Sequence, residues 1–375
     1  MNWGGATLRS EEGETMGLTT KATALDERST MDFVLTLRRR WADTLYPALR
    51  DEYDAKVATL PVKPSDGHEA AEVMHGLDLY PWFSWMERGQ QKMLWRSVQD
   101  AVLNRWDSLA PMLIPPDGEP VGSLELKPDF VLPKYYTAID IHIQPGGVWS
   151  DDTSALVYEE GAQIVMLRRN DEYLFHQLFA ETVLPDGPHK RVIDLGCGFG
   201  KSTRPLVDRF PDAEVIGVEL SAPNLRLAHA TAERMGKPIR FIQADGAATG
   251  LESGSADIVT GTMFLHEMPM KHVEAVLHEA ARLLRPGGSI HFLEFACTGD
   301  PFRDATNYEH GQRNNEPWIP VLMDADVIGM CERAGLTGAR WTPFDERERG
   351  LSPEGWGHRD EWHFPWAVLS AEKPV

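Results

Sequence analysis

The chain has 375 residues, of which 42% are hydrophobic, so it is long enough for about two to three domain-sized units. Acidic residues outnumber basic residues by 57 to 37, and the formal net charge is −20. Such a surface repels polyanions, which argues against a nucleic-acid partner. The three cysteines have neither the spacing of a zinc site nor that of a disulfide framework, a pattern typical of a reducing cytoplasm.

The first thirty residues are polar and mixed in charge, without the apolar core of a signal peptide. No stretch approaches the ~20 apolar residues that a membrane-spanning helix needs. We therefore expect a cytoplasmic protein without a membrane partner, whose residues 1–28 form a disordered tail.

Residues 29–150 are predicted to form a mainly helical N-terminal domain. Apolar residues recur at spacings of four from Trp41 to Val57, and Pro47 marks a new helical start. A second apolar face runs over residues 82–109, where several tryptophans indicate core or interface anchors, with stacking on a substrate as the alternative. Such a domain would serve as a lid, as a homodimer interface, or as both.

Residues 111–133 are rich in Pro and Gly and read as a connection. In TAIDIHIQPGGVW, isoleucines alternate with Asp140, His142 and Gln144, which predicts a half-buried strand ended by Pro145-Gly146-Gly147. Asp140 and His142 would then share one face, in solvent or in a cleft.

After residue 151 the pattern changes to helices that alternate with short apolar strands. This alternation predicts a mostly parallel sheet covered by helices on both faces. The expected strands are RVIDL (191–195), EVIGVE (214–219), IRFIQ (239–243), ADIVTG (256–261), SIHFLEF (289–295), ARWTPF (339–344) and PWAVLSA (365–371).

The stretch VIDLGCGFGKST, residues 192–203, raises the question of its ligand. A P-loop would require its first glycine at position 195, which is Leu195, and a dinucleotide fingerprint would require a glycine at position 201, which is Lys201. Neither pattern fits. Asp194, directly before the turn, would also repel a phosphate but suits an ammonium or a sulfonium.

Two further acids follow the next two expected strands. Glu219 stands 25 residues after Asp194, where it is placed to accept from ribose hydroxyls, and Asp245 follows the third strand, where it can accept from an adenine amino group. A cationic amino-acid head, a ribose and an adenine together describe S-adenosylmethionine.

Residues 190–295 resemble the core of the class I S-adenosylmethionine-dependent methyltransferases. VIDLGCGFG resembles the first motif of that family, Glu219 its ribose-binding acid, IQADG its adenine-side motif and LLRPGG its turn before strand five. The resemblance implies a Rossmann-like α/β fold with a seven-stranded sheet over 151–375, its last strand antiparallel, and methyl transfer without a metal. The residues that it implies for the cofactor S-adenosylmethionine are Asp194, Gly196, Cys197, Gly198, Gly200, Glu219, Leu220, Asp245, Gly246 and Met263.

Methyl transfer to a hydroxyl needs a group that removes a proton. His266 follows strand four and Glu294 ends strand five, and because these strands are neighbours in this fold, both side chains reach the same crevice. The surrounding stretch resembles the plant-type small-molecule O-methyltransferases. That resemblance implies His266 as the base, paired with Glu267 and supported by Glu294. The alternative is that His266 only lines the donor pocket.

Two segments are candidates for contact with the acceptor. One is 139–152, which contains His142 and Trp149; the other is 306–318, expected as a polar loop after strand five. The second segment offers Tyr308, Arg313 and Asn314, and Arg313 suits a carboxylate.

These features predict a methyltransferase of a small molecule, acting on oxygen with His266 as base. Nitrogen or sulfur as the acceptor atom stays open, since a thiolate or a free amine needs little help from a base. A macromolecular acceptor or a non-catalytic donor-binding module is a further alternative.

Overall fold

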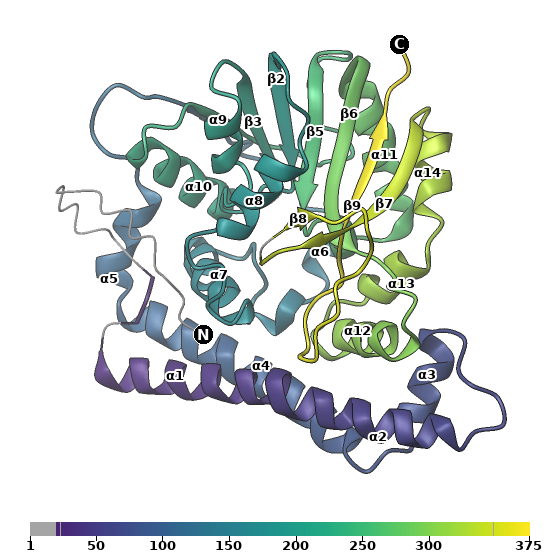
Figure 1. Cartoon of the computed structure of the whole chain (residues 1–375). Coiled ribbons are helices and arrows are strands. Elements are labelled where there is room, and N and C mark those ends of the chain that lie inside the picture. Colours follow the sequence, from purple (N-terminus) through teal and green to yellow (C-terminus); the bar gives the residue numbers. More distant parts are fainter. Residues whose placement is uncertain (1–19, 23, 348) are drawn as a thin grey trace, which may run out of the picture.

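Figure 1 shows the computed structural model, which describes residues 20–22, 24–347 and 349–375. The expected tail, 1–28, lies mostly outside the described residues, but its last part belongs to the first helix, which begins at Leu25. The helices are α1 Leu25–Arg40, η1 Trp41–Leu45, α2 Tyr46–Ala58, α3 Gly67–Met74, α4 Tyr80–Asn104, α5 Trp106–Leu109, η2 Ala110–Leu113, α6 Lys134–Thr137, η3 Ile141–Ile143, α7 Asp152–Val165, α8 Leu174–Thr182, α9 Arg204–Arg209, α10 Ala222–Arg234, η4 Leu265–Glu267, α11 Met270–Leu283, α12 Pro301–Arg313, α13 Trp318–Asp324 and α14 Val327–Arg333.

The strands form one sheet in the order β1-β4-β3-β2-β5-β6-β9-β7-β8. Their bounds are β1 Ser123–Glu125, β2 Arg191–Leu195, β3 Glu214–Glu219, β4 Ile239–Gln243, β5 Ala256–Thr262, β6 Leu284–Phe295, β7 Thr337–Asp345, β8 Gly350–Leu351 and β9 Trp366–Glu372. The strands from β1 to β6 pair in parallel, and β9 runs antiparallel to both β6 and β7. The expected seven-stranded Rossmann-like sheet is therefore confirmed, with the short strands β1 and β8 added at its edges.

The central strands are buried because helices cover both faces of the sheet (Figure 1). On one face, α11 contributes a stripe that includes Val273, Val276 and Leu277. On the other face, α8, α9 and α10 pack against residues such as Val192 and Phe241. This double covering explains why the strands are short, continuous apolar runs rather than alternating patterns.

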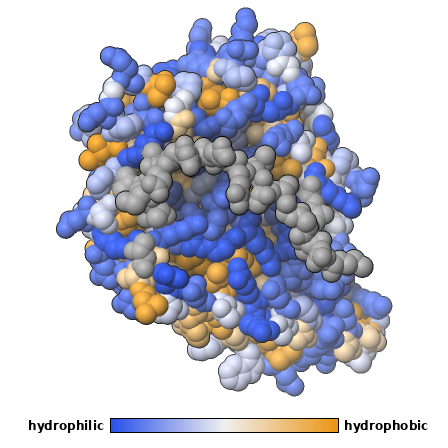
Figure 2. Space-filling model, turned by 60° about the vertical axis from the view of Figure 1, so that its left-hand side comes forward, coloured by the Kyte–Doolittle hydropathy of each residue, from blue (hydrophilic) through white to orange (hydrophobic). Residues whose placement is uncertain are grey.

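The N-terminal helices lie across one end of the sheet, below the strands in Figure 1. They share their cores with the rest of the chain: Trp95 of α4 packs with Phe199, and Trp41 packs in one cluster with Phe302 and Trp362. Among the described helices none combines the length and apolarity needed to cross a bilayer. Hydrophilic residues cover most of the face seen in Figure 2, and hydrophobic residues appear there in small groups.

Two local predictions are wrong. Residues 139–143 do not form a strand but a bend and the turn η3, in which His142 and Ile143 adopt left-handed conformations (φ 59° and 64°). The buried Gln144 side chain fixes this bend by donating to the carbonyls of Gly147 and Ser154 at 3.0 and 2.9 Å. Asp140 accepts from the Gly146 N–H, so it does not share a strand face with His142.

The polar segment 306–318 is also not a loop, since most of it belongs to α12. The side chain of Asp300 caps this helix by accepting from the Phe302 N–H at 3.1 Å, and Pro301 occupies its first turn. Ten of the thirteen residues of α12 are buried, although most of them are polar. Their polar groups therefore need partners inside the protein.

Candidate functional site

The turn after β2 is built from glycines in the left-handed region. Gly196, Gly198 and Gly200 have φ values of 69°, 50° and 81°. A Cβ atom at Gly196 would lie 2.2 Å from the ring of Phe264, so no larger residue fits there. The Gly196 N–H donates to the Val218 carbonyl at 2.8 Å, which ties the turn to the end of β3.

A cavity that is partly open to solvent lies against this turn and is called here the first cavity. The predicted cofactor residues that line it are Gly196, Gly198, Glu219, Leu220, Gly246 and Met263. Tyr136 and Tyr158 close it from the preceding part of the chain. The structure thus brings most of the predicted cofactor residues together at the carboxyl ends of the parallel strands.

Glu219 lies at the end of β3 and lines the first cavity. Its carboxylate accepts from the N–H groups of Gly198 and Ser221 at 3.1 and 2.8 Å and from the Tyr136 hydroxyl at 3.2 Å. Burial raises the pKa of Glu219. A carboxylate has about four acceptor positions, so Glu219 retains capacity for the hydroxyl of a ribose.

Asp194 lies beneath the turn, not among the residues that line the first cavity. Its Oδ2 atom accepts from the hydroxyls of Ser202 and Thr203 at 2.7 and 2.6 Å. Its Oδ1 atom is buried without a hydrogen-bond partner in the described part of the chain, and burial raises the pKa of Asp194 to about 6. An unpaired buried acceptor beside the turn fits a cationic ligand group better than a phosphate.

Two predicted cofactor residues are occupied elsewhere. Cys197 is buried and packs under the turn toward Gly217. Asp245 forms an ion pair with His272 at 2.8 Å and accepts from the Ala247 N–H. Neither Cys197 nor Asp245 lines the first cavity. The two neighbours of Asp245 in the chain, Ala244 and Gly246, do line it. The contact of Cys197 and Asp245 with a cofactor therefore stays a prediction.

A second cavity adjoins the first. Tyr158, Lys201, Met263 and Glu267 line both cavities. The titratable residues of the second cavity include His142, His266, Glu267, His310 and Glu316, and its aromatic walls are Trp95, Tyr158, Phe295, Phe364 and Trp366. A reacting group in the second cavity is therefore next to a ligand in the first.

His266 and Glu294 form a buried pair at the wall of the second cavity. The His266 Nδ1 atom lies 2.6 Å from Glu294 Oε2, and the N–H groups of Phe264 and Leu265 donate to Glu294 Oε1 at 2.5 Å. Burial alone would lower the pKa of His266, but Glu294 outweighs it and raises this pKa. An ionised carboxylate only accepts, so the proton of the neutral imidazole sits on Nδ1 and the Nε2 lone pair is free.

His142 bridges two carboxylates of the second cavity. Its Nδ1 atom lies 3.1 Å from Glu316, and its Nε2 atom lies 3.3 Å from Glu267. Burial would lower the pKa of His142, but Glu316 and Glu267 raise it to about 10. Glu267 therefore pairs with His142. The resemblance had implied that it pairs with His266. The left-handed backbone at His142 adds strain, a feature that clusters at functional sites.

Lys201 lies at the junction of the two cavities. Its Nζ atom is 3.9 Å from the Met263 sulfur and 5.6 Å from the ring centres of Tyr158 and Phe199. Burial lowers the pKa of Lys201 to about 8. A buried ammonium among aromatic rings makes this junction sensitive to the charge of any ligand.

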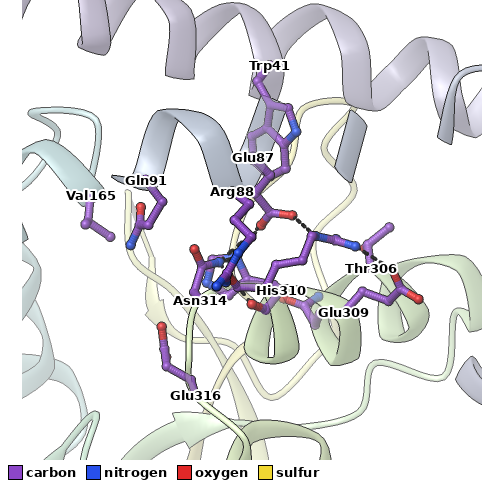
Figure 3. Close-up of polar contacts among 12 residues, drawn as sticks. Trp41, Glu87, Arg88, Gln91, Val165, Thr306, Glu309, His310, Asn314 and Glu316 are labelled. Carbon is purple, nitrogen blue, oxygen red and sulfur yellow. Dashed lines mark hydrogen bonds and ion pairs between the residues drawn. The ribbon is translucent and has the colours of Figure 1, made fainter. Parts of the chain in front are cut away.

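A buried charge network holds α12 against α4 beside the second cavity (Figure 3). Glu87 of α4 accepts from His310 Nδ1 at 2.5 Å and from Arg313, which also pairs with Glu309. Burial alone would raise the pKa of Glu87, but Arg313 and His310 outweigh it and lower it to about 2. The network fixes His310, which lines the second cavity.

The remaining predicted acceptor residues lie away from both cavities. Arg313 is engaged by Glu87, and Asn314 donates to the His310 carbonyl at 2.9 Å. The Tyr308 hydroxyl donates to Asp324 at 2.6 Å, and Trp149 packs against Gly147. Of the five acceptor residues expected from the sequence, only His142 lines the second cavity.

Sequence reasoning missed several residues that line these cavities. Lys201 follows the glycine motif and Glu316 lies in the segment 306–318, so both could have been identified from the local sequence. Trp95, Phe364 and Trp366 gave no such signal, because their convergence depends on how distant elements pack. Among the described residues no group of three or more His, Cys, Asp and Glu is arranged to hold a metal ion.

Comparison with known proteins agrees with this geometry. Residues 192–288 match the family model described as a methyltransferase domain. A demethylmenaquinone methyltransferase of Thermus thermophilus is 37% identical over 106 residues, which are 28% of this chain and 47% of the relative. Tocopherol O-methyltransferase of Arabidopsis thaliana is 28% identical over 181 residues, 48% of each chain.

The chain thus spans about half the length of these curated relatives. Among solved structures, phosphoethanolamine N-methyltransferase 2 of Haemonchus contortus in complex with S-adenosyl-L-methionine is 15% identical, with a TM-score of 0.42 over 60% of this chain and 58% of that one. The fold and the matched segment define a class I S-adenosylmethionine-dependent methyltransferase domain. Residues 192–288 are thus a methyltransferase domain, and S-adenosylmethionine is the cofactor that its sequence motifs imply.

Proposed function

We propose that the protein methylates an oxygen atom of a small molecule that binds in the second cavity, with His266 as the general base. The observation that carries this proposal is the His266–Glu294 pair at the wall of a cavity that adjoins the first one. The relatives named for demethylmenaquinone and tocopherol support a small-molecule acceptor.

S-adenosylmethionine, when bound, supplies an electrophilic methyl group. In the first cavity the glycine turn would hold its amino-acid part, and Glu219 would accept from its ribose. The unpaired Oδ1 atom of Asp194 supplies negative charge near its amino group.

In the second cavity, Glu294 is fixed by two backbone N–H donors and accepts the Nδ1 proton of His266. His266 Nε2 then takes the proton of the acceptor hydroxyl. The resulting imidazolium is stabilised by Glu294 and by Glu316, whose carboxylate lies 4.0 Å from Nε2. The aromatic walls exclude water from this step.

The proposed base is tested by His266→Gln, measured with a panel of phenols. We expect kcat to fall by about 10²- to 10⁴-fold, while the affinity for S-adenosylmethionine changes less than about twofold. The wild-type rate rises with pH through the raised pKa of His266, and the variant loses this rise.

His278→Gln is the matched control, because His278 is an exposed histidine on α11. Unchanged turnover of His266→Gln on every phenol would refute His266 as the base. A homodimer and a cytoplasmic location are further parts of the proposal; the exposed Phe33, Trp82 and Trp85 of the N-terminal helices support the dimer.

A further inference from the structure

An open groove, called here the outer groove, shares four lining residues with the second cavity. It lies between the segment that follows α7 and the segment before β9, and its apolar lining includes Val165, Met166, Leu174, Trp362, Phe364 and Trp366. Val165, Met166, Phe364 and Trp366 line the second cavity as well. The two sites therefore share a wall, and the groove lies next to the cavity that contains His266.

Aromatic rings form a continuous ladder along this wall. Phe295 contacts the His266 ring edge-on at 4.6 Å and stacks on Trp366 at 4.7 Å. Trp366 contacts Phe364 at 5.0 Å, and Phe364 contacts Trp362 at 4.6 Å. The ladder thus connects the proposed base with the lining of the outer groove, with Phe295, Trp362 and Trp366 themselves buried.

The rim of the outer groove carries arginines that are already paired. Arg169 lies 3.6 Å from Asp43, and Arg347 lies 2.6 Å from Glu361. At the floor, the side chain of Leu174 is 56% exposed, an unusual position for a leucine in a groove. The groove therefore suits an apolar group better than an anionic one.

We propose that the acceptor is an elongated phenol: its hydroxyl-bearing ring lies in the second cavity against His266, and an apolar substituent follows the aromatic ladder into the outer groove. Flat aromatic walls favour a ring, since offset and edge-on contacts add to the burial of its surface. The wall that the two sites share favours a substituent several methylenes long. This inference rests on the proposed O-methylation and adds the class of acceptor.

The test compares para-cresol with para-alkylphenols up to para-octylphenol. Each methylene that the groove buries is expected to raise kcat/KM by about fourfold, the equivalent of ~0.8 kcal/mol, until the chain leaves the groove. In Leu174→Asp, the ratio of kcat/KM for para-octylphenol to that for para-cresol should fall at least about tenfold. Met235→Asp is the control, because Met235 is 54% exposed and lies at the end of α10, outside the groove.

Binding of the same phenols is measured separately by calorimetry in the presence of S-adenosylhomocysteine. Affinity that rises with chain length, with no methylated product, would uphold the groove and overturn O-methylation. Methylation whose kcat/KM does not depend on chain length, or an equal effect of Leu174→Asp and Met235→Asp on the ratio, would overturn the groove and leave O-methylation standing.

Discussion

Glu87 is the buried charge on which the contact between α4 and α12 depends. Its carboxylate accepts from His310 (Figure 3) and from Arg313, and Glu87 is only 3% exposed. Glu87→Gln keeps the size of the side chain but removes the negative charge. The buried Arg313 guanidinium then retains Glu309 as its remaining acidic partner, and we expect a marked loss of stability.

The pKa of Glu87 sets the size of the expected loss in the free energy of unfolding. A pKa near 2 in the folded state, against an ordinary value of 4.5, corresponds to about 3 kcal/mol of stability at neutral pH. Because the folded pKa is the lower one, this contribution is fully present above about pH 4.5. It is lost as the pH falls from there toward about 2, and about 2 kcal/mol of it remains at pH 3.5.

The assay is urea unfolding of wild type and Glu87→Gln between pH 8 and pH 3.5. The difference in free energy of unfolding should be constant from pH 8 to about 5 and should shrink at lower pH. Asp100→Asn, an exposed acid on the same helix, is the control and should have a difference close to zero. A Glu87→Gln difference below about 1 kcal/mol at pH 7, or one that does not shrink below pH 4.5, would show that the network does not stabilise the fold in this way.

Two further perturbations address the cavities directly. Gly196→Ala combines a left-handed backbone with a clash against Phe264 and should abolish binding of S-adenosylmethionine by calorimetry; Gly236→Ala has a similar φ of 64° but open space, so it should keep that binding. His142→Gln should lower the free energy of unfolding by at most about 5 kcal/mol at pH 6. Because the folded pKa of His142 is the higher one, this loss should diminish as the pH rises from 6.5 toward 10, and a loss that grows with pH would contradict the bridge.

The parallel core was predictable because its signals are local. The central strands are short apolar runs, and two of them carry a candidate site residue at or next to their end: Asp194 in RVIDL and Glu219 in EVIGVE. The glycines of residues 196–200 predicted a turn after the first strand, and in the structure all three have left-handed φ values. Acids placed at successive strand ends then identified one edge of the sheet, since parallel strands align their carboxyl ends.

The errors arose where distant partners decide the local structure. The alternating isoleucines of 139–143 imitate a strand, but the hydrogen bonds of Gln144 and the carboxylates around His142 favour a bend. The polar residues of α12 imitate a surface loop, although Asp300 and Pro301 are a helix start that could have been recognised. Their partner Glu87 lies more than two hundred residues away in the sequence, so no local pattern predicts this contact.

The two cavities differ in where their walls come from, and this difference bears on specificity. The turn of the first cavity lies in the segment that matches the methyltransferase family model. The second cavity takes Gln91 and Trp95 from α4, His142 from η3 and Phe364 from the segment before β9, all outside that match. Specificity for the acceptor should therefore depend on elements that are distant in the sequence and meet only in the folded protein. Substitutions in α4 should alter the choice of acceptor more than the affinity for S-adenosylmethionine.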